Sequence, residues 1–287
     1  MSAPPGDAAR AGALDPAGDG GHEARLPARM LAYWGPPALV FAAFLAVWYA
    51  TTYLLLDADR RFLLPPPHRV ITEGFLDPAT RAELMGALAS TSQVMLLGLS
   101  LAILSGVIAA VVMSQRYWIE RSFYPYAILS QTIPILAMVP LIGFWLGFNF
   151  TSRVIIVVIV SVFPIVTNTL LGLKSAEPEL HDLFTLHRAS RRARLVKLQL
   201  PGAIPAMIAS FRISAGLAVI GAIIADFFFR QGQPGLGRLL DVYRARLQTE
   251  ALFSAVILCS LLGIAVFAFF GWLGQRLTRS WHASARP

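Results

Sequence analysis

Six long runs with almost no Asp, Glu, Lys or Arg constrain this chain more than any other feature of its sequence. About 20 apolar residues in a helix, at about 1.5 Å of rise each, are enough to cross a bilayer. Each run reaches that length, and only the fifth is interrupted, by Arg212: Met30–Leu56, Leu84–Gln115, Ser122–Ser152, Val154–Leu173, Leu198–Ala225 and Ala251–Gln275. The sequence therefore predicts an all-α integral membrane protein with six transmembrane helices.

The composition supports a membrane protein. Hydrophobic residues make up 56% of the chain and charged residues only 14%, whereas soluble domains carry about 25% charge. The formal net charge of +8 could suggest a nucleic-acid partner, but the basic residues lie mainly at the edges of the apolar runs. Membrane topology places them there, so we expect membrane lipid as a partner and no nucleic acid.

The runs divide the chain into segments of predictable location. An even number of spans puts both termini on one side, and the bias of Lys and Arg, strongest in the loop 174–200, makes that side cytoplasmic. No basic segment leads directly into a short apolar core, so no signal peptide is predicted. We expect a disordered cytoplasmic tail 1–29, a first transmembrane helix 30–56, a periplasmic loop 57–83, a five-helix core 84–275 that contains the cytoplasmic loop, and a cytoplasmic tail 276–287. The run Leu84–Gln115 exceeds one upright span, which predicts a tilted helix.

The loop 174–200 has the pattern of a short amphipathic helix. Pro178 suits the first helical position, and acidic residues would lie at the positive end of that helix. Apolar side chains recur at helical spacing along it, and such a helix can lie in a groove on a partner protein. The relevant residues are Glu177, Glu179, Asp182, Leu180, Leu183, Phe184 and His187. The alternative is a solvated basic loop that only follows the charge bias.

The order of several motifs resembles a known family. In this loop Asp182-Leu183-Phe184, then Arg188, then Leu198 precede Leu200-Pro201 with the spacing of the family pattern Glu-Ala-Ala, Gly, Ile-x-Leu-Pro. The segments Pro134–Leu141 and Gly235–Gly237 also resemble that family. It comprises the inner-membrane permease subunits of binding-protein-dependent ABC importers, and the resemblance covers roughly residues 60–281. The branch that it resembles most carries sulfonates, nitrate, taurine and related small solutes.

This resemblance implies partners and a coupling site. It implies a second permease subunit in a homo- or heterodimer, a separate ATPase that binds ATP and Mg, an extracytoplasmic solute-binding protein, and a location in the bacterial plasma (inner) membrane. The ATPase-coupling residues that it implies are Glu177, Glu179, Asp182, Leu183, Phe184, His187, Arg188, Ala189, Leu200 and Pro201. Two departures stand out, because Leu183 and Phe184 replace a small pair and Arg188 replaces a glycine. A left-handed residue other than glycine costs about 1–2 kcal/mol.

The sequence offers no catalytic constellation. Neither lysine, Lys174 nor Lys197, lies in a phosphate-binding Gly-x-x-x-x-Gly-Lys pattern. Cys259 stands alone within an apolar run, and the histidines lack the spacing of metal ligands. We therefore expect no enzyme activity and no cofactor or metal bound by this chain.

Five residues are candidates for a translocation pathway or gate. Pro134 and Pro140 would interrupt the third helix and could line a pathway or form a packed kink. Ser214 belongs to a small-residue stripe with Ser210, Ala218 and Ala222, which could face the second subunit or pack within this chain. Arg212 could attract an anion, make a structural ion pair or extend to the interface. Asp226 could belong to an outer gate or bind water.

The predicted function is a transmembrane permease subunit of an ATP-driven importer of a small solute such as a sulfonate, nitrate or taurine. The main alternative is an ATP-independent secondary transporter or channel, and a third possibility is a membrane scaffold. The absence of Asp and Glu from the predicted helix cores argues against proton coupling.

Overall fold

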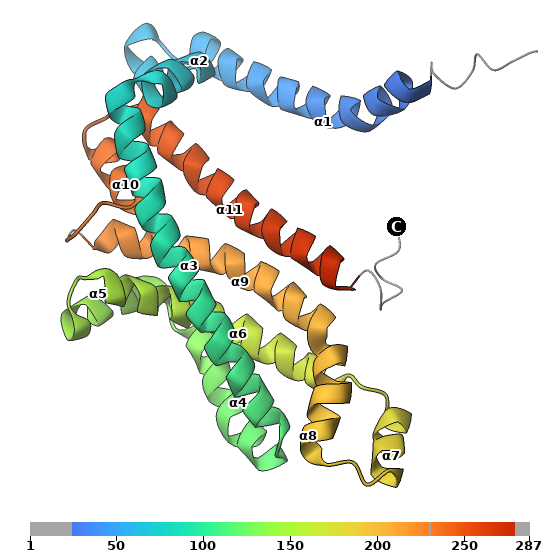
Figure 1. The fold of residues 1–287 in the computed structure, drawn as a ribbon. Helices are drawn as coiled ribbons and strands as arrows, with labels where there is room; N and C mark the ends of the chain where they lie inside the picture. Colours follow the sequence, from blue (N-terminus) through green and yellow to red (C-terminus); the bar gives the residue numbers. More distant parts are fainter. Residues whose placement is uncertain (1–24, 230, 279–287) are drawn as a thin grey trace, which may run out of the picture. The chain divides into compact units, whose positions relative to one another are not determined.

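The structure is a computed structural model that describes residues 25–229 and 231–278 (Figure 1). Throughout these residues the regular secondary structure is helical, which confirms the predicted all-α class. The chain divides after Ala58 into two compact units. Most of the predicted N-terminal tail, residues 1–24, and the last residues of the C-terminal tail, 279–287, lie outside the described residues.

The first unit contains one long helix. Helix α1 (Arg25–Ala50) includes Pro36 and Pro37 and continues into a π-helical turn, Thr51–Leu55. It begins earlier than the predicted Met30. The charged residue before an apolar run marks the edge of the hydrophobic segment rather than the point where helical hydrogen bonding starts.

The second unit contains the remaining elements. A 3-10 turn (Ala58–Leu63), a short helix α2 (Pro67–Arg69) and a π-helical segment (Val70–Leu76) precede the core. The core helices are α3 (Pro78–Ser114), α4 (Tyr117–Thr132), α5 (Ile135–Leu146), α6 (Phe150–Lys174), α7 (Pro178–Leu186), α8 (Arg191–Arg194), α9 (Leu200–Phe228), α10 (Leu236–Ala245) and α11 (Thr249–Thr278). A π-helical turn, Leu195–Gln199, joins α8 to α9.

Helix α3 shows why the predicted loop 57–83 is too long. The helix begins at Pro78 because Asp77 caps it, and the Thr80 N–H donates to Asp77 Oδ2 at 2.8 Å. That N–H holds the pKa of the Asp77 carboxyl below its usual value of 3.8. The charged residues up to Glu83 therefore lie inside the helix, and α3 is one uninterrupted helix, as predicted for its apolar part.

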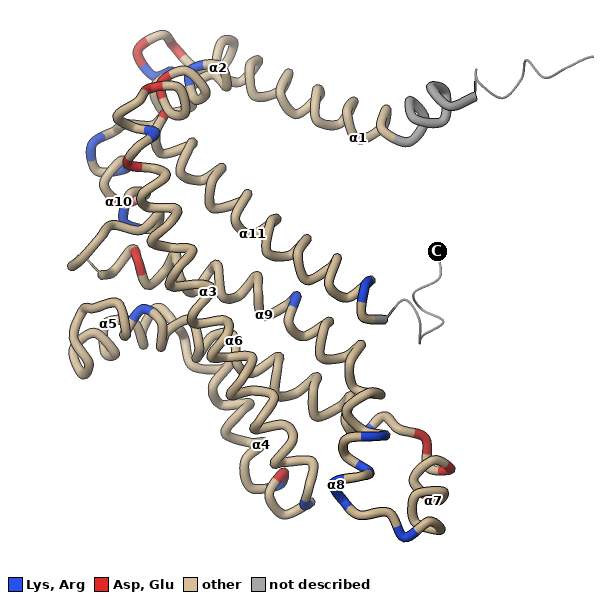
Figure 2. Tube along the Cα trace, in the orientation of Figure 1, with Lys and Arg blue, Asp and Glu red and all other residues tan. Residues whose placement is uncertain are grey.

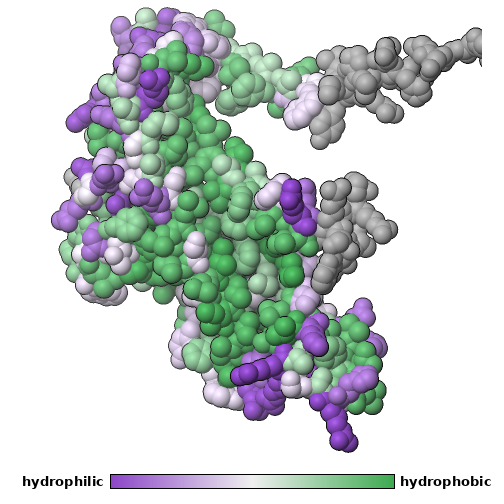
Figure 3. All heavy atoms as spheres, viewed as in Figure 1, coloured by the Kyte–Doolittle hydropathy of each residue, from purple (hydrophilic) through white to green (hydrophobic). Residues whose placement is uncertain are grey.

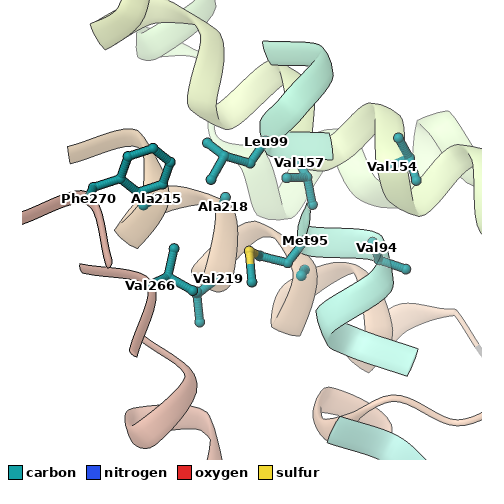
Figure 4. Packing of buried hydrophobic residues seen from close by; sticks show 11 residues of the cluster. Val94, Met95, Leu99, Val154, Val157, Ala215, Ala218, Val219, Val266 and Phe270 are labelled. Atoms are coloured by element: carbon teal, nitrogen blue, oxygen red, sulfur yellow. The ribbon is translucent and has the colours of Figure 1, made fainter. Parts of the chain in front are cut away.

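Helices α3, α6, α9 and α11 form the centre of the second unit. Their facing sides share one buried cluster, which Figure 4 shows from close by: Val94, Met95, Leu99, Val154, Val157, Ala215, Ala218, Val219, Ala222, Val266 and Phe270. The small residues of α9 allow the helices to pack closely. The four small residues Ser210, Ser214, Ala218 and Ala222 are fully buried within this chain. Ser214 Oγ donates to the Ser161 carbonyl of α6 at 2.8 Å. Packing within the chain is thus the alternative that the structure supports for this stripe.

The outer surface of these helices is apolar. Side chains such as Leu104 (60% exposed) and Ile264 (63% exposed) point away from the core, and Figure 3 shows hydrophobic atoms over α3, α9 and α11. Charged residues gather near the helix ends (Figure 2). A surface of this kind is stable in lipid and not in water.

Within the described part of the chain, five helices are long and apolar enough to span a membrane, and a sixth span results if α4 and α5 are counted together. The predicted third span, Ser122–Ser152, consists of two helices, because the chain bends by 101° between α4 and α5. The break lies at Ile133 and Pro134, as the first proline predicted. Pro140 lies inside α5 and does not interrupt it.

Candidate functional site

Helix α7 is a short helix that buries none of its residues in this chain. Pro178 occupies its first turn and Glu177 is its N-cap, which confirms the predicted start. Leu180, Leu183 and Leu186 are 39%, 46% and 81% exposed. Among the other predicted residues Glu179, Asp182 and His187 are exposed and Phe184 is half-buried. The predicted amphipathic helix therefore exists, and its apolar side chains are available to a partner.

Helix α7 ends in a left-handed residue. Arg188 has a φ of 51°. The Ala189 N–H donates to the Phe184 carbonyl and the Arg188 N–H to the Thr185 carbonyl, both at 2.9 Å. This pattern is a Schellman motif, which usually places glycine where Arg188 lies. Arg188 therefore adopts the left-handed conformation that glycine takes without steric cost.

A side-chain contact connects α7 to the long helix that follows it. Arg194 Nη2 donates to Thr185 Oγ1 at 2.8 Å, and Ser190 caps α8. From Arg191 the helical segment continues to Phe228, a length of roughly 57 Å at 1.5 Å per residue. Leu200 and Pro201 lie at the start of α9, where Leu200 packs beside Leu170 and Leu173 of α6. The C-terminal end of α7 is therefore connected, through Arg194 and the helical segment that follows it, to the C-terminal end of α9.

The break between α4 and α5 borders a cavity of about 530 Å³. Pro134 lines it, as do Gln131 and Met138 from the two halves of the broken helix. Ile159 and Val160 of α6 and Leu217 of α9 complete its wall. Non-helical backbone at membrane depth is tolerated where it borders a cavity. The sequence identified Pro134 but not the facing residues, because no local pattern marks them.

Arg212 and Ser214 lie away from the wall of this cavity. The guanidinium of Arg212 is 4.3 Å from the centre of the Phe267 ring on α11 and lies next to Gly271. This cation–π contact offsets part of the cost of placing a charge in a span. Ser214 is buried against α6.

Asp226 is fully buried in a polar network that links four helices. Its Oδ1 accepts from Arg153 Nη1 of α6 at 2.9 Å and its Oδ2 accepts from Thr91 Oγ1 of α3 at 2.6 Å. Thr91 Oγ1 in turn accepts from the Leu236 N–H at the start of α10 at 2.8 Å. The alternative that Asp226 binds bulk water is wrong, and so is the prediction of a helix core without carboxylates, because α9 continues past Ala225 to Phe228.

Sequence reasoning missed the partners in this network. Arg153 falls between the predicted spans Ser122–Ser152 and Val154–Leu173, but the structure places it in the first turn of α6 with its side chain only 5% exposed. A single Arg between two long apolar runs was the available signal, since such a charge needs a partner if the two runs pack together. Thr91 gave no signal.

Two glycines allow α10 to approach this network. A Cβ atom at Gly235 would lie 1.9 Å from Asp226 Oδ2, and one at Gly237 would lie 2.0 Å from the Ile223 carbonyl oxygen. Any larger residue at either position would push α10 away from α9. The Gly235-Leu236-Gly237 motif thus has a packing explanation.

Within residues 25–229 and 231–278, no three His, Cys, Asp or Glu side chains lie close enough together to hold a metal ion. Three regions could therefore serve binding or conformational change. They are the exposed helix α7, the cavity at the α4–α5 break and the buried ion pair of Arg153 and Asp226.

Comparison with known proteins identifies relatives along most of the chain. The formylaminopyrimidine transport permease protein ThiX of Halalkalibacterium halodurans is 29% identical over 81% of this chain and 90% of its own length. The taurine transport system permease protein TauC of Escherichia coli is 27% identical over 85% and 89%. The nitrate import permease protein NrtB of Synechococcus elongatus is 23% identical over 84% and 88%. These matches confirm the predicted resemblance to importer permeases of this branch.

Two solved structures share the fold. A crystal structure of an amino acid ABC transporter with histidines has a TM-score of 0.54 at 19% identity and covers 71% of this chain and 97% of its own. An inward-facing structure of the MetNI methionine ABC transporter has a TM-score of 0.51 at 16% identity, covering 75% and 98%.

A family match covers the core helices. Residues 102–279, more than half of the chain, match the family described as binding-protein-dependent transport system inner membrane component. The chain therefore belongs to this family, whose members are transport permeases and not enzymes.

Proposed function

We propose that this chain is the transmembrane permease subunit of an ATP-driven importer and that α7 is the surface on which the ATPase docks. The observation that carries the proposal is the exposure of apolar side chains on α7. Leu180, Leu183 and Leu186 point outward, and no residue of α7 is buried within this chain. Exposed apolar side chains on a charged helix are costly in water and favour a protein partner.

The proposed assembly contains three kinds of component besides this chain. A second permease subunit, identical or related, lies beside this one in the bacterial plasma membrane, with both termini in the cytoplasm. ATPase subunits bind ATP and Mg and dock on residues 177–189 and on Leu200 and Pro201. An extracytoplasmic binding protein delivers the solute to the opposite face.

The transported solute is small. The relatives are named for formylaminopyrimidine, taurine and nitrate, and a sulfonate, nitrate, taurine or similar compound fits this range. The cavity at the α4–α5 break, with Pro134 in its wall, is the proposed part of the pathway inside this subunit. Movement of α7 by the ATPase would reach this cavity through α9, which contributes Leu217.

Cross-linking tests ATPase docking directly. Leu183→Cys in the full chain, labelled with a thiol-reactive benzophenone reagent and irradiated in native membranes, should give a cross-linked band that is also photolabelled by 8-azido-ATP. The variant Leu63→Cys serves as the control, because Leu63 is similarly exposed at 54% but lies in the 3-10 turn before the core. It should give no labelled band.

A second variant tests the energetics of docking. Phe184→Asp should remove the ATPase from the purified assembly, because the docking surface would bury a carboxylate, and it should leave membrane insertion intact. ATPase retained at the wild-type level in this variant, or no nucleotide-labelled band with Leu183→Cys, would contradict the proposal. Uptake by the isolated chain driven by a proton or sodium gradient would instead support the secondary-transporter alternative.

A further inference from the structure

A second cavity, of about 380 Å³, lies beside the buried ion pair. We refer to it as the Arg153 pocket. It is lined by residues at the N-terminal end of α6. Figure 1 shows that this end of α6 lies away from α7. Its polar lining includes Gln93, Asn149, Arg153, Gln231 and Gln233. The volume is within the range of pockets that hold small ligands.

Arg153 lines this pocket and has a hydrogen-bond donor that is unpaired among the described residues. Its side chain is only 5% exposed, and one guanidinium nitrogen, Nη1, donates to Asp226. Its Nε is buried without a hydrogen-bond partner in the described part of the chain. A buried N–H without an acceptor is unfavourable, and an ordered ligand or water commonly supplies the missing acceptor. Gly232 lies beside the guanidinium, since a Cβ atom there would be in van der Waals contact with Nη2 at 3.8 Å.

The electrostatics of the pocket favour negative charge. Among the residues that line the pocket, Arg153 is the one with a charged side chain. Its partner Asp226 does not line the pocket, and Asp226 Oδ2 accepts a hydrogen bond from Thr91. The ion pair is thus oriented with its positive end toward the pocket. The N-terminus of α6, capped by Asn149, adds the positive end of a long helix dipole.

We propose that the Arg153 pocket binds the oxyanion group of the transported solute, as a first site at the face opposite the ATPase. This inference rests on the proposed function for the direction of transport only. The guanidinium of Arg153 donates to an anionic oxygen of the solute, and the amide groups of Gln93, Gln231 and Gln233 supply further donors around the same group.

Saturation-transfer difference NMR on the purified full chain tests this proposal with two matched probes. Methanesulfonate carries an oxyanion, and dimethyl sulfone has nearly the same shape but no charge. We expect a methyl signal from methanesulfonate that saturates with concentration, and a signal at least about tenfold weaker from dimethyl sulfone, as for the loss of a charge-assisted hydrogen bond. Equal signals from the two probes would overturn the proposal.

Two variants and a control assign the signal to the pocket. The double variant R153Q/D226N removes the charge and leaves a neutral hydrogen-bonding pair. Gln93→Phe fills the pocket and leaves the ion pair intact, so a folding defect of the double variant does not decide the outcome. Each should reduce the methanesulfonate signal about tenfold or more, while Arg81→Gln, a charge removed from the exposed first turns of α3, should not.

A wild-type signal in Gln93→Phe would overturn the assignment. The result is independent of ATPase docking, because the isolated chain is used. A normal methanesulfonate signal without the α7 cross-link would count against the proposed function. A normal cross-link without the methanesulfonate signal would count against binding in this pocket.

Discussion

Two ion pairs of helix α6 differ strongly in burial. Arg153 and Asp226 have side chains 5% and 0% exposed, whereas Lys174 and Glu120 at the other end of the helix are 45% and 22% exposed. A buried charge that loses its partner is left without compensation by water, but an exposed one is solvated again. The same chemical contact therefore has very different importance at the two ends.

Arg153→Gln should lower the free energy of unfolding by about 3–5 kcal/mol, because Asp226 would remain buried without its cation. Lys174→Gln should lower it by at most about 1 kcal/mol. Thermal unfolding of both variants in the same detergent measures the difference. Similar losses in the two variants would show that the Arg153 pair is not buried as the structure has it.

Arg188→Gly should stabilise helix α7, because Arg188 holds a φ of 51° that glycine adopts without steric cost. The expected gain is about 1 kcal/mol. Amide hydrogen exchange of residues 180–187 should slow by about fivefold. Leu186→Gly, placed within the helix instead, should have the opposite effect, and slower exchange in that variant as well would refute the explanation.

Tyr243 gives the unfolding free energy a dependence on alkaline pH. Burial raises the pKa of its hydroxyl well above the usual 10, and the neighbouring Glu83, which accepts from that hydroxyl at 3.0 Å, raises it further. The folded state therefore keeps the proton at a pH where the unfolded state loses it. The resulting stabilisation is complete below pH 10 and is lost as the pH rises through the folded-state pKa. Unfolding from pH 9 to 11 should show a steeper loss of stability in the wild type than in Tyr243→Phe, and equal slopes would contradict the assignment.

At the scale of elements, the sequence predicted which helices are present better than it predicted their bends and directions. The runs Val154–Leu173 and Ala251–Gln275 correspond to α6 and α11, because apolar length alone determines a span. Helix α7 followed from Pro178 and the acidic residues around it. The 101° bend after α4 did not, because Pro134 only ends a helix. The direction of α5 is fixed by the packing of Val139 and Ile142 against α6 and α9.

Filling the cavity at this bend tests its proposed role in the pathway. Leu217→Trp should reduce solute uptake in membrane vesicles to about a tenth of the wild-type rate or less, equivalent to about 1.4 kcal/mol on the limiting barrier. ATPase docking should be unchanged. Ile220→Trp is the matched control, because Ile220 lies on the same helix but is 53% exposed. Normal uptake with Leu217→Trp would exclude the cavity from the pathway.

At the scale of the whole molecule, the sites come together only through the fold. Thr91 is 135 positions from Asp226, and Arg153 is 73 positions from it. No spacing rule connects residues so far apart, so the sequence could propose Asp226 as a candidate but could not name its partners. The order of motifs in the sequence was enough to identify the family. The hydrogen-bond network around Asp226 became visible only from the packing of the helices in the structure.

The contact between Thr185 and Arg194 should be needed for coupling. Thr185→Val removes the acceptor for Arg194 Nη2, at a cost of about 1 kcal/mol, without changing the exposed leucines of α7. ATP hydrolysis by the reconstituted assembly should persist while the solute moved per ATP falls several-fold. Thr185→Ser keeps the hydroxyl and should restore the ratio. An unchanged ratio in the valine variant would show that α7 and α8 communicate by another route.

The close approach at Gly235 and Gly237 has a consequence for how the molecule opens. Two surfaces that leave no room for a methyl group cannot slide along each other, because any sideways step begins with a collision. Helix α10 and the adjoining end of α9 are therefore expected to travel as one rigid block during a transport cycle. The hinge for that motion must lie outside this junction, and Ala substituted at Gly237 would act as a wedge that holds the block apart.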